Sequence, residues 1–416
     1  MQVDDRNRAA GGERDPKPGA DPKPGVDPEP GPDSEPKPGS GRRPKAGGAA
    51  HVLGREGTAG GAILDVGAFL ARDGSTGAPV AIDAENPHAG VLVGKRGTGK
   101  SYTLGVIAEE LARVEGVSPI VLDPMGVFAG LGELPGGRVI DARIDPATLS
   151  PDVWPELLGL DPTGAAGSLL WRTVERRQNG CGALATASED DPTSIAGILA
   201  EIETADAPDP VKRAASNHLR LADAWGIFDP AAPTMGELTG AEATVIDCRS
   251  LTPAAMAAVG HVIARGLYDY RIERGTGPLP WLLVDEAHAF LEGIGEPAFR
   301  TLFTRGRTPG VSLVCATQRP SALPDVAVSQ ADLVIAHRLT AERDVDALRD
   351  AQPAYLGEDL GRVLPSGTGE ALVVDDRTES AHVVRVRERR TPHGGDSPTA
   401  SGIEANRARA ARRRNG

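Results

Sequence analysis

The chain has 416 residues, of which 40% are hydrophobic and only 3% aromatic, and its net charge is −13. This length allows two domains, or one large domain with appendages, and aliphatic side chains must build most of the core. No apolar run is long enough to predict a membrane span, and the polar N-terminus does not have the pattern of a signal peptide. We therefore expect a cytoplasmic protein without contact to a membrane.

The charge pattern is acid-rich and lysine-poor, and most of the positive charge is arginine. Such a composition suits a salt-rich cytoplasm, where the Debye length falls to about 3 Å at 1 M salt and self-repulsion is screened. An acidic protein encoded by a GC-rich genome has a similar composition, and both explanations remain open. Cys181, Cys248 and Cys315 have no metal-binding spacing, and we expect the last two to be small buried hydrophobic residues.

Changes in composition divide the chain into five parts. Residues 1–60 repeat the unit Asp-Pro-Lys/Glu-Pro-Gly and predict a solvated tail, because proline and glycine prevent a core. Two core parts, 61–144 and 236–390, flank a predicted helical insertion at 145–235. The arginine-rich tail 391–416 is typical of segments that touch nucleic acid, and equally of segments that are simply solvated.

The first ordered elements lead into a phosphate-binding loop. Strands are predicted at 62–66 and 79–83, and a buried strand at 88–93 precedes Gly94–Ser101. This loop matches the pattern G-x-x-x-x-G-K-[ST] at every fixed position, and a helix is predicted at 102–113. A chance glycine-rich turn would not need this strand-and-helix context. The candidate nucleotide-binding residues are Gly94, Lys95, Arg96, Gly97, Thr98, Gly99, Lys100, Ser101 and Tyr102.

The residue types in this loop indicate particular roles. Glycines let successive backbone N–H groups point at a triphosphate, and the following helix N-terminus adds partial positive charge. Lys100 can reach the β- and γ-phosphates, and the Ser101 hydroxyl can bind Mg²⁺. The sequence therefore predicts ATP and Mg²⁺ as ligands.

The next strand, predicted at 118–123, ends in Asp123. A carboxylate at this end of a parallel strand faces the ligand crevice, so Asp123 is a candidate metal ligand. A turn-capping role for the same side chain is an equal alternative. Helical spacing then predicts helices at 152–158, 164–177, 192–203 and 210–224, with core bulk from Trp154, Trp171 and Trp225.

A second apolar strand carries two acids at its end. After a strand at 243–249 and a helix at 253–271, the run 281–284 leads directly into Asp285 and Glu286. Beside a phosphate-binding loop, this pattern predicts that Asp285 holds Mg²⁺ and that Glu286 polarises the attacking water. Two solvated acids after a buried strand are the alternative.

The remaining elements complete an α/β pattern. A helix at 296–305 and a strand at 311–316 come first, and Gln318 follows that strand, where it can sense the γ-phosphate or orient water. Then come the predicted strand 333–336, the helix 341–350 and an antiparallel pair at 370–375 and 382–385. Alternating strands and helices predict an α/β fold with a mainly parallel sheet flanked by helices.

Several separated motifs together resemble one family. The fragments VGKRGTGKSYTLGVIAEEL, IVLDPMG, WLLVDEAHAFL and GVSLVCATQRPSALPDVAVSQADLVIAHRLTAERDV are similar to HerA/FtsK-like ATPases, in particular the HerA-type hexameric DNA translocases and helicases of archaea. The resemblance covers about residues 78–385. It implies a RecA-like P-loop NTPase that forms a homo-hexamer with ATP between neighbouring subunits. With the acid-rich composition, it also implies a haloarchaeal protein.

The resemblance also assigns roles to single residues. It implies that Asp123 and Asp285 are site acids, that Glu286 is the catalytic base and that Gln318 is the sensor. Arg307 looks like the arginine finger that reaches the next subunit's site, with Arg305 as the alternative, and an arginine there would neutralise charge on the γ-phosphate.

Two positions depart from the family pattern. HerA proteins usually begin with a β-barrel domain, and we expect the ordered chain before Gly94 to be too short for one, which puts docking of a nuclease partner in doubt. The family's strand-end motif usually carries glutamate after the glycine, whereas Val127 follows Gly126 here. Any role of that glutamate is absent or belongs to another acid.

The function implied is an ATP-hydrolysing ring motor that translocates or unwinds double-stranded DNA. An ATPase for a conjugation or secretion substrate is the first alternative, and such proteins usually bring membrane helices. A nucleotide-gated scaffold is the second, and the intact set of site residues argues against it. That set comprises Lys100, Asp285, Glu286 and Gln318.

Overall fold

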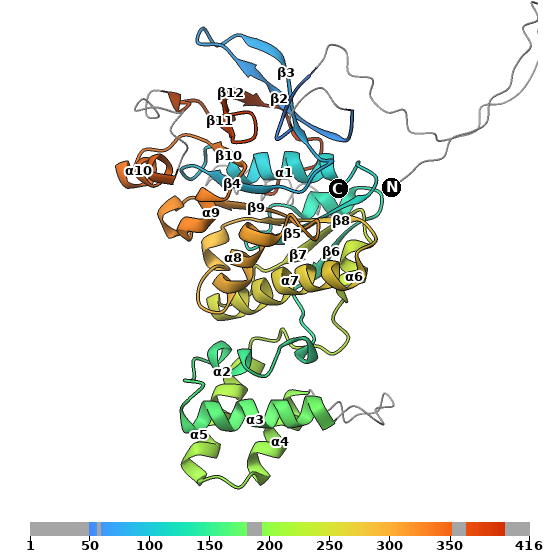
Figure 1. Ribbon diagram of the computed structural model, residues 1–416, viewed down its shortest axis with the longest axis vertical. Coiled ribbons are helices and arrows are strands. Elements are labelled where there is room, and N and C mark those ends of the chain that lie inside the picture. The colour runs from blue at the N-terminus through green and yellow to red at the C-terminus, as the bar shows by residue number, and fades with distance from the viewer. Residues whose placement is uncertain (1–49, 56–59, 181–193, 352–362, 396–416) are drawn as a thin grey trace, which may run out of the picture. The chain divides into compact units, whose positions relative to one another are not determined.

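The computed structural model describes residues 50–55, 60–180, 194–351 and 363–395, all within the unit 46–416 (Figure 1). These residues contain one 12-stranded sheet, in the order β1-β3-β2-β12-β11-β10-β4-β9-β8-β5-β7-β6. The strands are β1 (His51–Leu53), β2 (Ile63–Leu70), β3 (Thr76–Asp83), β4 (Ala89–Val93), β5 (Val117–Asp123), β6 (Gly137–Asp141), β7 (Ala243–Asp247), β8 (Leu279–Val284), β9 (Ser312–Thr317), β10 (Leu333–Ala336), β11 (Glu370–Asp375) and β12 (Ser380–Val386).

The sheet is parallel where it carries the predicted site. From β10 to β6, every neighbouring pair is parallel. β11, β12, β2 and β3 continue beyond β10 in antiparallel pairs, and β1 pairs parallel with β3. The predicted α/β class is therefore confirmed, as are the lead-in pair and the terminal pair. The described residues before Gly94 extend this sheet, and β1 and β6 are strands that the sequence pattern did not predict.

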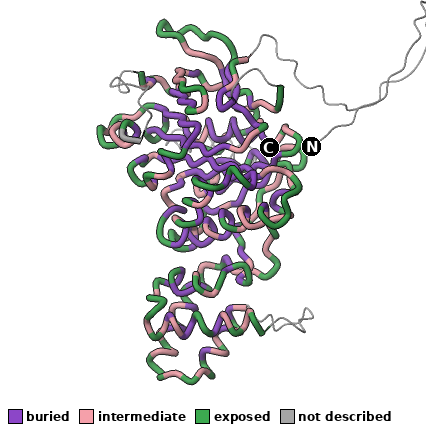
Figure 2. The backbone as a smooth tube through the Cα atoms, viewed as in Figure 1, coloured by how far each residue is buried: buried purple, intermediate pink, exposed green. Residues whose placement is uncertain are grey.

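Helices cover both faces of the sheet, and the side-chain alternation of the strands explains why. On β8, Trp281 and Leu283 belong to the apolar cluster under α1, whereas Leu282 and Val284 belong to the cluster under α7 and α8. Figure 2 shows the buried strands at the centre of this arrangement. The helices around the sheet are α1 (Lys100–Leu111), α6 (Met235–Thr239), α7 (Pro253–Arg274), α8 (Gly295–Arg305), α9 (Asp325–Ser329) and α10 (Glu342–Ala351).

The predicted helices between β6 and β7 are present and pack on one another. They are α2 (Val153–Leu157), α3 (Ala165–Gly180), α4 (Ile195–Thr204) and α5 (Asp209–Asp223). The segments that lead into and out of this group lie side by side, since Ile144 N–H donates to the Ile227 carbonyl at 2.8 Å. The domain limits 145–235 stay a prediction.

The three tryptophans of this group differ in burial. Trp154 is fully buried and stacks on Phe228 with ring centroids 5.5 Å apart. Trp225 is half-buried beside the same phenylalanine. The prediction that Trp171 supplies core bulk is wrong, because 37% of it is exposed while its helix neighbour Leu170 takes the inward position.

The two described cysteines are buried, as predicted, and burial raises the pKa of the Cys248 thiol to about 12. Cys181 lies outside the described residues, as do nearly all residues of the two predicted tails. Among the described helices, none combines the length and the hydrophobicity that a membrane span needs.

Candidate active site

Apart from Arg307, the predicted site residues lie at one edge of the sheet. Gly94 follows β4, Gln318 follows β9, Asp285 follows β8 and Asp123 ends β5. These four strands are neighbours in the order β4-β9-β8-β5 and run parallel. Their carboxyl ends therefore meet at the same edge, which is where ligands bind in sheets of this kind.

The loop between β4 and α1 depends on its glycines. Gly97 and Gly99 have φ angles of 76° and 114°, which other residues rarely adopt. At Gly94, with φ 156°, a Cβ atom would lie 2.6 Å from the Cβ of His337. Within the loop, Thr98 Oγ1 donates to the Lys95 carbonyl at 2.7 Å, and the side chains of Lys95 and Arg96 are exposed.

The Lys100 side chain turns back into its own loop. It is 5% exposed, and its Nζ donates to the Lys95 carbonyl at 3.3 Å. Burial lowers the pKa of Lys100, and the nearby Glu286 and Asp285 act in the opposite direction. An ammonium held inside a loop of backbone N–H groups is a suitable partner for phosphate oxygens.

Ser101 and Asp285 come together although they lie far apart in the sequence. Ser101 Oγ donates to Asp285 Oδ2 at 2.9 Å, and the carboxylate is fully buried. Asp285 Oδ1 has no hydrogen-bond partner within the described residues. Burial, opposed by the Ser101 hydrogen bond and aided by the Glu286 charge, raises the pKa of Asp285 to about 7.

This pair of oxygens fits Mg²⁺. Hydroxyl and carboxylate oxygens are hard ligands, and Mg²⁺ typically takes one or two protein ligands together with water and substrate phosphates. No cluster of three or more metal-binding side chains of the His, Cys, Asp or Glu type exists within the described residues. The remaining ligands of a metal here would therefore come from the phosphates and from water.

Glu286 has an unusual backbone. Its φ of 45° and ψ of 48° lie in the left-handed region, which costs a residue with a side chain about 1–2 kcal/mol. Glu286 Oε2 is buried and has no hydrogen-bond partner within the described residues. Such strain persists only where the surrounding structure imposes it, and it is concentrated at functional sites.

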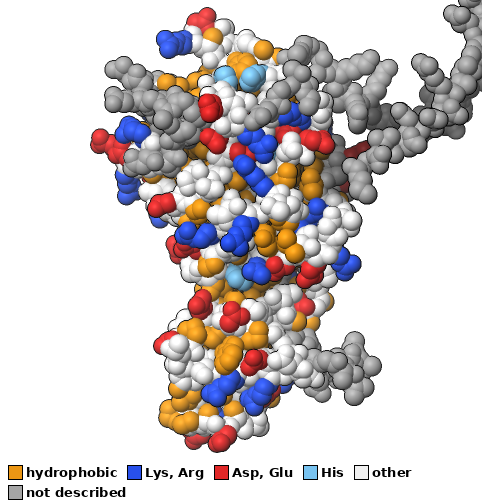
Figure 3. Space-filling model, viewed as in Figure 1, with side chains coloured by type: hydrophobic (Ala, Val, Ile, Leu, Met, Phe, Trp, Pro, Cys, Tyr) orange, Lys and Arg blue, Asp and Glu red, His pale blue; other side chains and the backbone are white. Residues whose placement is uncertain are grey.

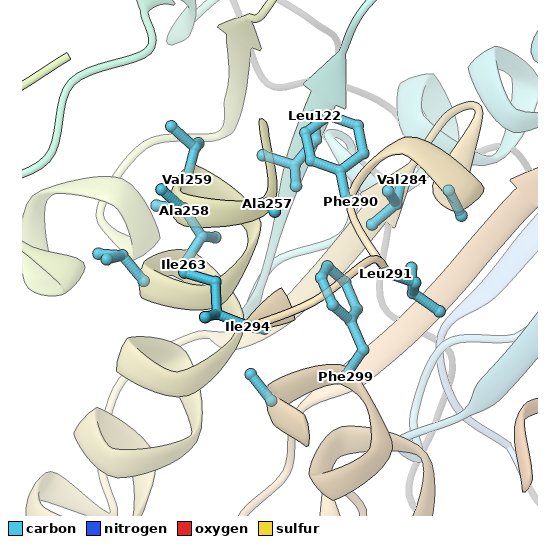
Figure 4. Close-up of a cluster of buried hydrophobic side chains, with 14 of the residues drawn as sticks. Leu122, Ala257, Ala258, Val259, Ile263, Val284, Phe290, Leu291, Ile294 and Phe299 are labelled. Carbon is cyan, nitrogen blue, oxygen red and sulfur yellow. The ribbon is translucent and has the colours of Figure 1, made fainter. Parts of the chain in front are cut away.

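The segment after Glu286 is held by an apolar anchor (Figure 4). Phe290 and Phe299 are fully buried against α7. Gly260 on α7 leaves room for them, since a Cβ there would lie 3.1 Å from Phe290 Cβ and 3.1 Å from Phe299 Cε2. This packing fixes the chain four residues beyond the predicted base, close to the strained backbone of Glu286.

The end of β9 also contacts the Glu286 segment. His288 Nδ1 lies 3.5 Å from Glu286 Oε2 and 3.3 Å from Thr317 Oγ1. Gln318, the residue after Thr317, is half-buried at this edge between the ends of β4 and β8. His288 was not predicted as a site residue, although its position two residues after Glu286 is a signal that was available.

The Asp123 carboxylate is occupied by its own turn. Its two oxygens accept backbone N–H groups from Met125, Gly126, Val127 and Phe128 at 2.7 to 3.2 Å. Burial raises the pKa of Asp123, and these hydrogen bonds oppose that effect. The geometry favours the turn-capping alternative over a metal ligand.

Two further neighbours of the loop come from the far end of the chain. His337 follows β10, and its Nδ1 donates to the Glu370 carbonyl at 2.7 Å. Its Nε2 lies 2.9 Å from Thr103 Oγ1 and accepts a hydrogen bond from that hydroxyl when the ring is neutral. Burial lowers the pKa of His337 to about 4, so the ring is neutral. Tyr102 Oη accepts the Arg389 N–H at 2.7 Å, which ties the first turn of α1 to the segment after β12.

Arg307 lies at the opposite edge of the sheet from the loop of its own chain. It precedes β9, whereas Gln318 follows it, and a strand of six residues spans about 20 Å. Its Nη2 lies 2.9 Å from Asp332 Oδ2. Arg305, in the last turn of α8, is exposed and has no ion pair within the described residues.

Comparison with known protein families gives a match over part of the chain. Residues 64–265 match the family DUF87, described as the central domain of helicase HerA. This match includes the loop at Gly94–Ser101 and Asp123 and ends within α7. No curated protein matches the chain.

Several solved structures are similar. VirB4 of Thermoanaerobacter pseudethanolicus has a TM-score of 0.63 at 17% identity, over 80% of this chain and 98% of that chain. The bacterial conjugative coupling protein TrwBdeltaN70 has a TM-score of 0.49 at 12% identity, over 74% and 87% of the two chains. The genome packaging NTPase B204 from Sulfolobus turreted icosahedral virus 2, solved with ATP-gammaS, has a TM-score of 0.38 at 14% identity, over 72% and 96%. At this identity the VirB4 similarity speaks for the fold alone, and the two lower scores carry no argument.

Proposed function

Because the chain carries a P-loop ATPase domain of the HerA central-domain family, we propose that it hydrolyses ATP as a ring motor acting on double-stranded DNA. The observation that carries the ATPase proposal is the contact of 2.9 Å between Ser101 Oγ and Asp285 Oδ2. It joins the phosphate-binding loop to the acid pair after β8, so that Lys100 and Glu286 face the same place.

The side chains divide the chemistry among them. Lys100 neutralises charge on the β- and γ-phosphates, and a bound Mg²⁺ would supply further positive charge there. Ser101 and Asp285 would hold that ion. Glu286 orients the attacking water and accepts its proton at Oε2, which has no hydrogen-bond partner within the described residues. Gln318 donates a hydrogen bond to the water or the γ-phosphate.

The position of Arg307 supports a ring. An arginine some 20 Å from the site of its own chain can complete only a site on a neighbouring protomer. Protomers that contact one another through two different surfaces close into a ring when the rotation permits, and we propose a homo-hexamer. Arg307 then neutralises charge on the γ-phosphate in the neighbour's site.

The charge of the chain constrains how it holds DNA. A net charge of −13 argues against broad nonspecific attraction to phosphates. The face in Figure 3 carries acidic and basic side chains interspersed with one another. We therefore propose that enclosure within the ring, rather than a large basic surface, keeps the protein on DNA.

The test measures ATP turnover with and without long double-stranded DNA, together with the mass of the assembly. We expect DNA to stimulate turnover and the mass to equal six chains. Glu286→Gln should lower turnover at least about a thousandfold and keep ATP binding. The control Glu292→Gln changes an exposed acid in the same segment and should behave as the wild type.

Two outcomes would count against this function. If the protein hydrolyses ATP, does not bind DNA and is not stimulated by it, the DNA-motor function is wrong. The protein would then be an ATPase with another cargo, such as a conjugation or secretion substrate. Equal turnover in Glu286→Gln would remove the assignment of the base.

A further inference from the structure

A buried charge cluster lies at the amino ends of β4 and β10, far from the phosphate-binding loop. At its centre is Asp332, which is 2% exposed. Its Oδ1 accepts the Ala89 N–H at 2.9 Å. Its Oδ2 lies 2.8 Å from His88 Nδ1, 2.9 Å from Arg307 Nη2 and 3.3 Å from Arg377 Nε.

Arg307 is the outermost member of this cluster. Its side chain is 46% exposed, and Asp332 is its one ion-pair partner within the described residues. A guanidinium has five N–H donors in a fixed fork, so a contact through Nη2 leaves the others open. The cluster therefore holds one side of the fork and leaves the rest facing outward.

Asp332 also contacts a buried histidine. His88 is fully buried between the two acids, with Nε2 3.5 Å from Asp83 Oδ2. Asp83 in turn accepts the Arg55 Nε–H at 2.8 Å. A carboxylate fixed in this way offers a firm support for an exposed arginine.

Asp332 is also connected to the phosphate-binding loop through β4. The N–H that Asp332 accepts belongs to Ala89, the first residue of β4, and β4 ends where the phosphate-binding loop begins. The strand fixes the distance between the loop of one protomer and the arginine that the same protomer offers. In a ring, each protomer would contribute its loop to one site and its Arg307 to the next, and this distance sets the spacing between the two contributions.

We propose that Asp332 is a positioning residue for Arg307, holding its guanidinium so that the open N–H groups reach a phosphate bound by the neighbouring protomer. This inference rests on the proposed ring ATPase. Asp332 touches neither substrate nor metal and acts through Arg307 alone. A free arginine side chain samples many rotamers, and displacement of a reacting group by 1 Å can cost about a hundredfold in rate.

The test is a double-mutant cycle on turnover in the full chain. Arg307→Ala should lower kcat at least about a thousandfold. Asp332→Asn should lower kcat about ten- to a hundredfold with KM for ATP unchanged. In the double variant, Asp332→Asn should add nothing to the loss from Arg307→Ala.

Asp83→Asn is the matched control. It disturbs the same histidine and the same buried cluster without touching Arg307. The Ala89 N–H and Arg377 still hold Asp332 in this variant, so its kcat should stay within about twofold of the wild type, at a temperature below its unfolding midpoint. If Asp332→Asn does not fold, Asp332→Glu keeps the charge and shifts the carboxylate, and its kcat should fall between the wild type and Arg307→Ala.

The possible results distinguish a failure of the positioning role from a failure of the proposed ring ATPase. Loss of turnover in Arg307→Ala but none in either folded Asp332 variant would overturn the positioning role and leave the finger in place. Equal losses in Asp332→Asn and Asp83→Asn, or losses that add in the double variant, would overturn it as well. Full turnover in Arg307→Ala would overturn the finger and the positioning role together, while Glu286→Gln would still report on the ATPase.

Discussion

Both edges of the parallel sheet carry acids with buried carboxylate oxygens, but some of these oxygens lack partners in the described part of the chain at one edge, whereas those of Asp332 are paired at the other. At the carboxyl edge, Asp285 Oδ1 and Glu286 Oε2 have no hydrogen-bond partner within the described residues. At the amino edge, Asp332 contacts a backbone N–H, a histidine and two arginines. Buried polar groups are normally paired, so an unpaired carboxylate beside a phosphate-binding loop indicates a place kept for a ligand.

The pKa values follow this difference. Asp285 and Asp332 are almost equally buried, at 0% and 2% exposed. Burial raises the pKa of Asp285 to about 7, with the Ser101 hydrogen bond as the main opposing effect. Burial acts in the same direction on Asp332, but the hydrogen bond from His88 and the nearby positive charges hold its pKa below the ordinary value. Partners, and not depth, separate a ligand site from a structural cluster.

The largest effect expected from this comparison tests Asp285, whose Oδ1 has no hydrogen-bond partner within the described residues. Asp285→Asn should lower ATP turnover at least about a hundredfold, because the charge that holds the metal is lost and metal ions supply several kcal/mol to the transition state. Its unfolding midpoint without nucleotide should not fall, since a buried charge is replaced by a neutral amide whose oxygen can still accept the Ser101 hydrogen bond. Turnover and thermal unfolding with and without Mg²⁺ measure both effects.

Asp123→Asn is the comparison for this variant. It removes an acceptor for the turn at Met125–Phe128, so it should lower the free energy of unfolding by about 1–3 kcal/mol. Its response to Mg²⁺ should remain that of the wild type. If the Mg²⁺ dependence of Asp123→Asn shifted as strongly as that of Asp285→Asn, the turn-capping interpretation would be wrong.

The second prediction concerns the paired acids. Asp83→Asn should lower the free energy of unfolding by about 3–5 kcal/mol, because Arg55 and His88 lose a buried charged partner. Asp269→Asn removes an exposed partner of Arg265 and should cost less than about 1 kcal/mol. Urea unfolding measures both, and similar costs for the two variants would contradict the comparison between buried and exposed pairs.

The smallest effect is a pH dependence of stability. Burial alone would lower the pKa of His88, but hydrogen bonds to Asp332 and Asp83 outweigh it and the pKa is raised, against a small opposing effect of Arg377. The stabilisation is therefore fully present below about pH 6.5 and is lost as the pH rises through the raised folded-state value. Unfolding midpoints between pH 6 and pH 9 should fall for the wild type and fall less for His88→Gln. An equal slope in both proteins would contradict this.

Local patterns in the sequence were sufficient to predict much of the candidate site. Fixed spacing identifies Lys100 and Ser101, because a phosphate-binding loop needs those residue types at those positions. An apolar run that ends in two acids identifies Asp285 and Glu286 in the same way. The expected strands and helices were also found, since period-2 and period-3.6 patterns depend on near neighbours in the chain.

The residues that surround and position the candidate site could not be predicted from the sequence. His88 and His337 are single histidines whose roles depend on partners hundreds of residues away, such as Asp332 and Glu370. Trp171 was expected inside because tryptophan is large and apolar, yet the packing of α3 turns it outward. Asp123 illustrates the same limit, since the choice between ligand and cap depends on where four backbone N–H groups point.

By itself the sequence determined the phosphate-binding loop, its acids and the α/β class, because each depends on residue type at short spacing. Only the tertiary structure decided that Ser101 meets Asp285, that Glu286 is held in a strained conformation and that Arg307 lies on Asp332 at the opposite edge. Strand order and direction decide which of these distant residues lie close together, and no single stretch of the sequence determines either.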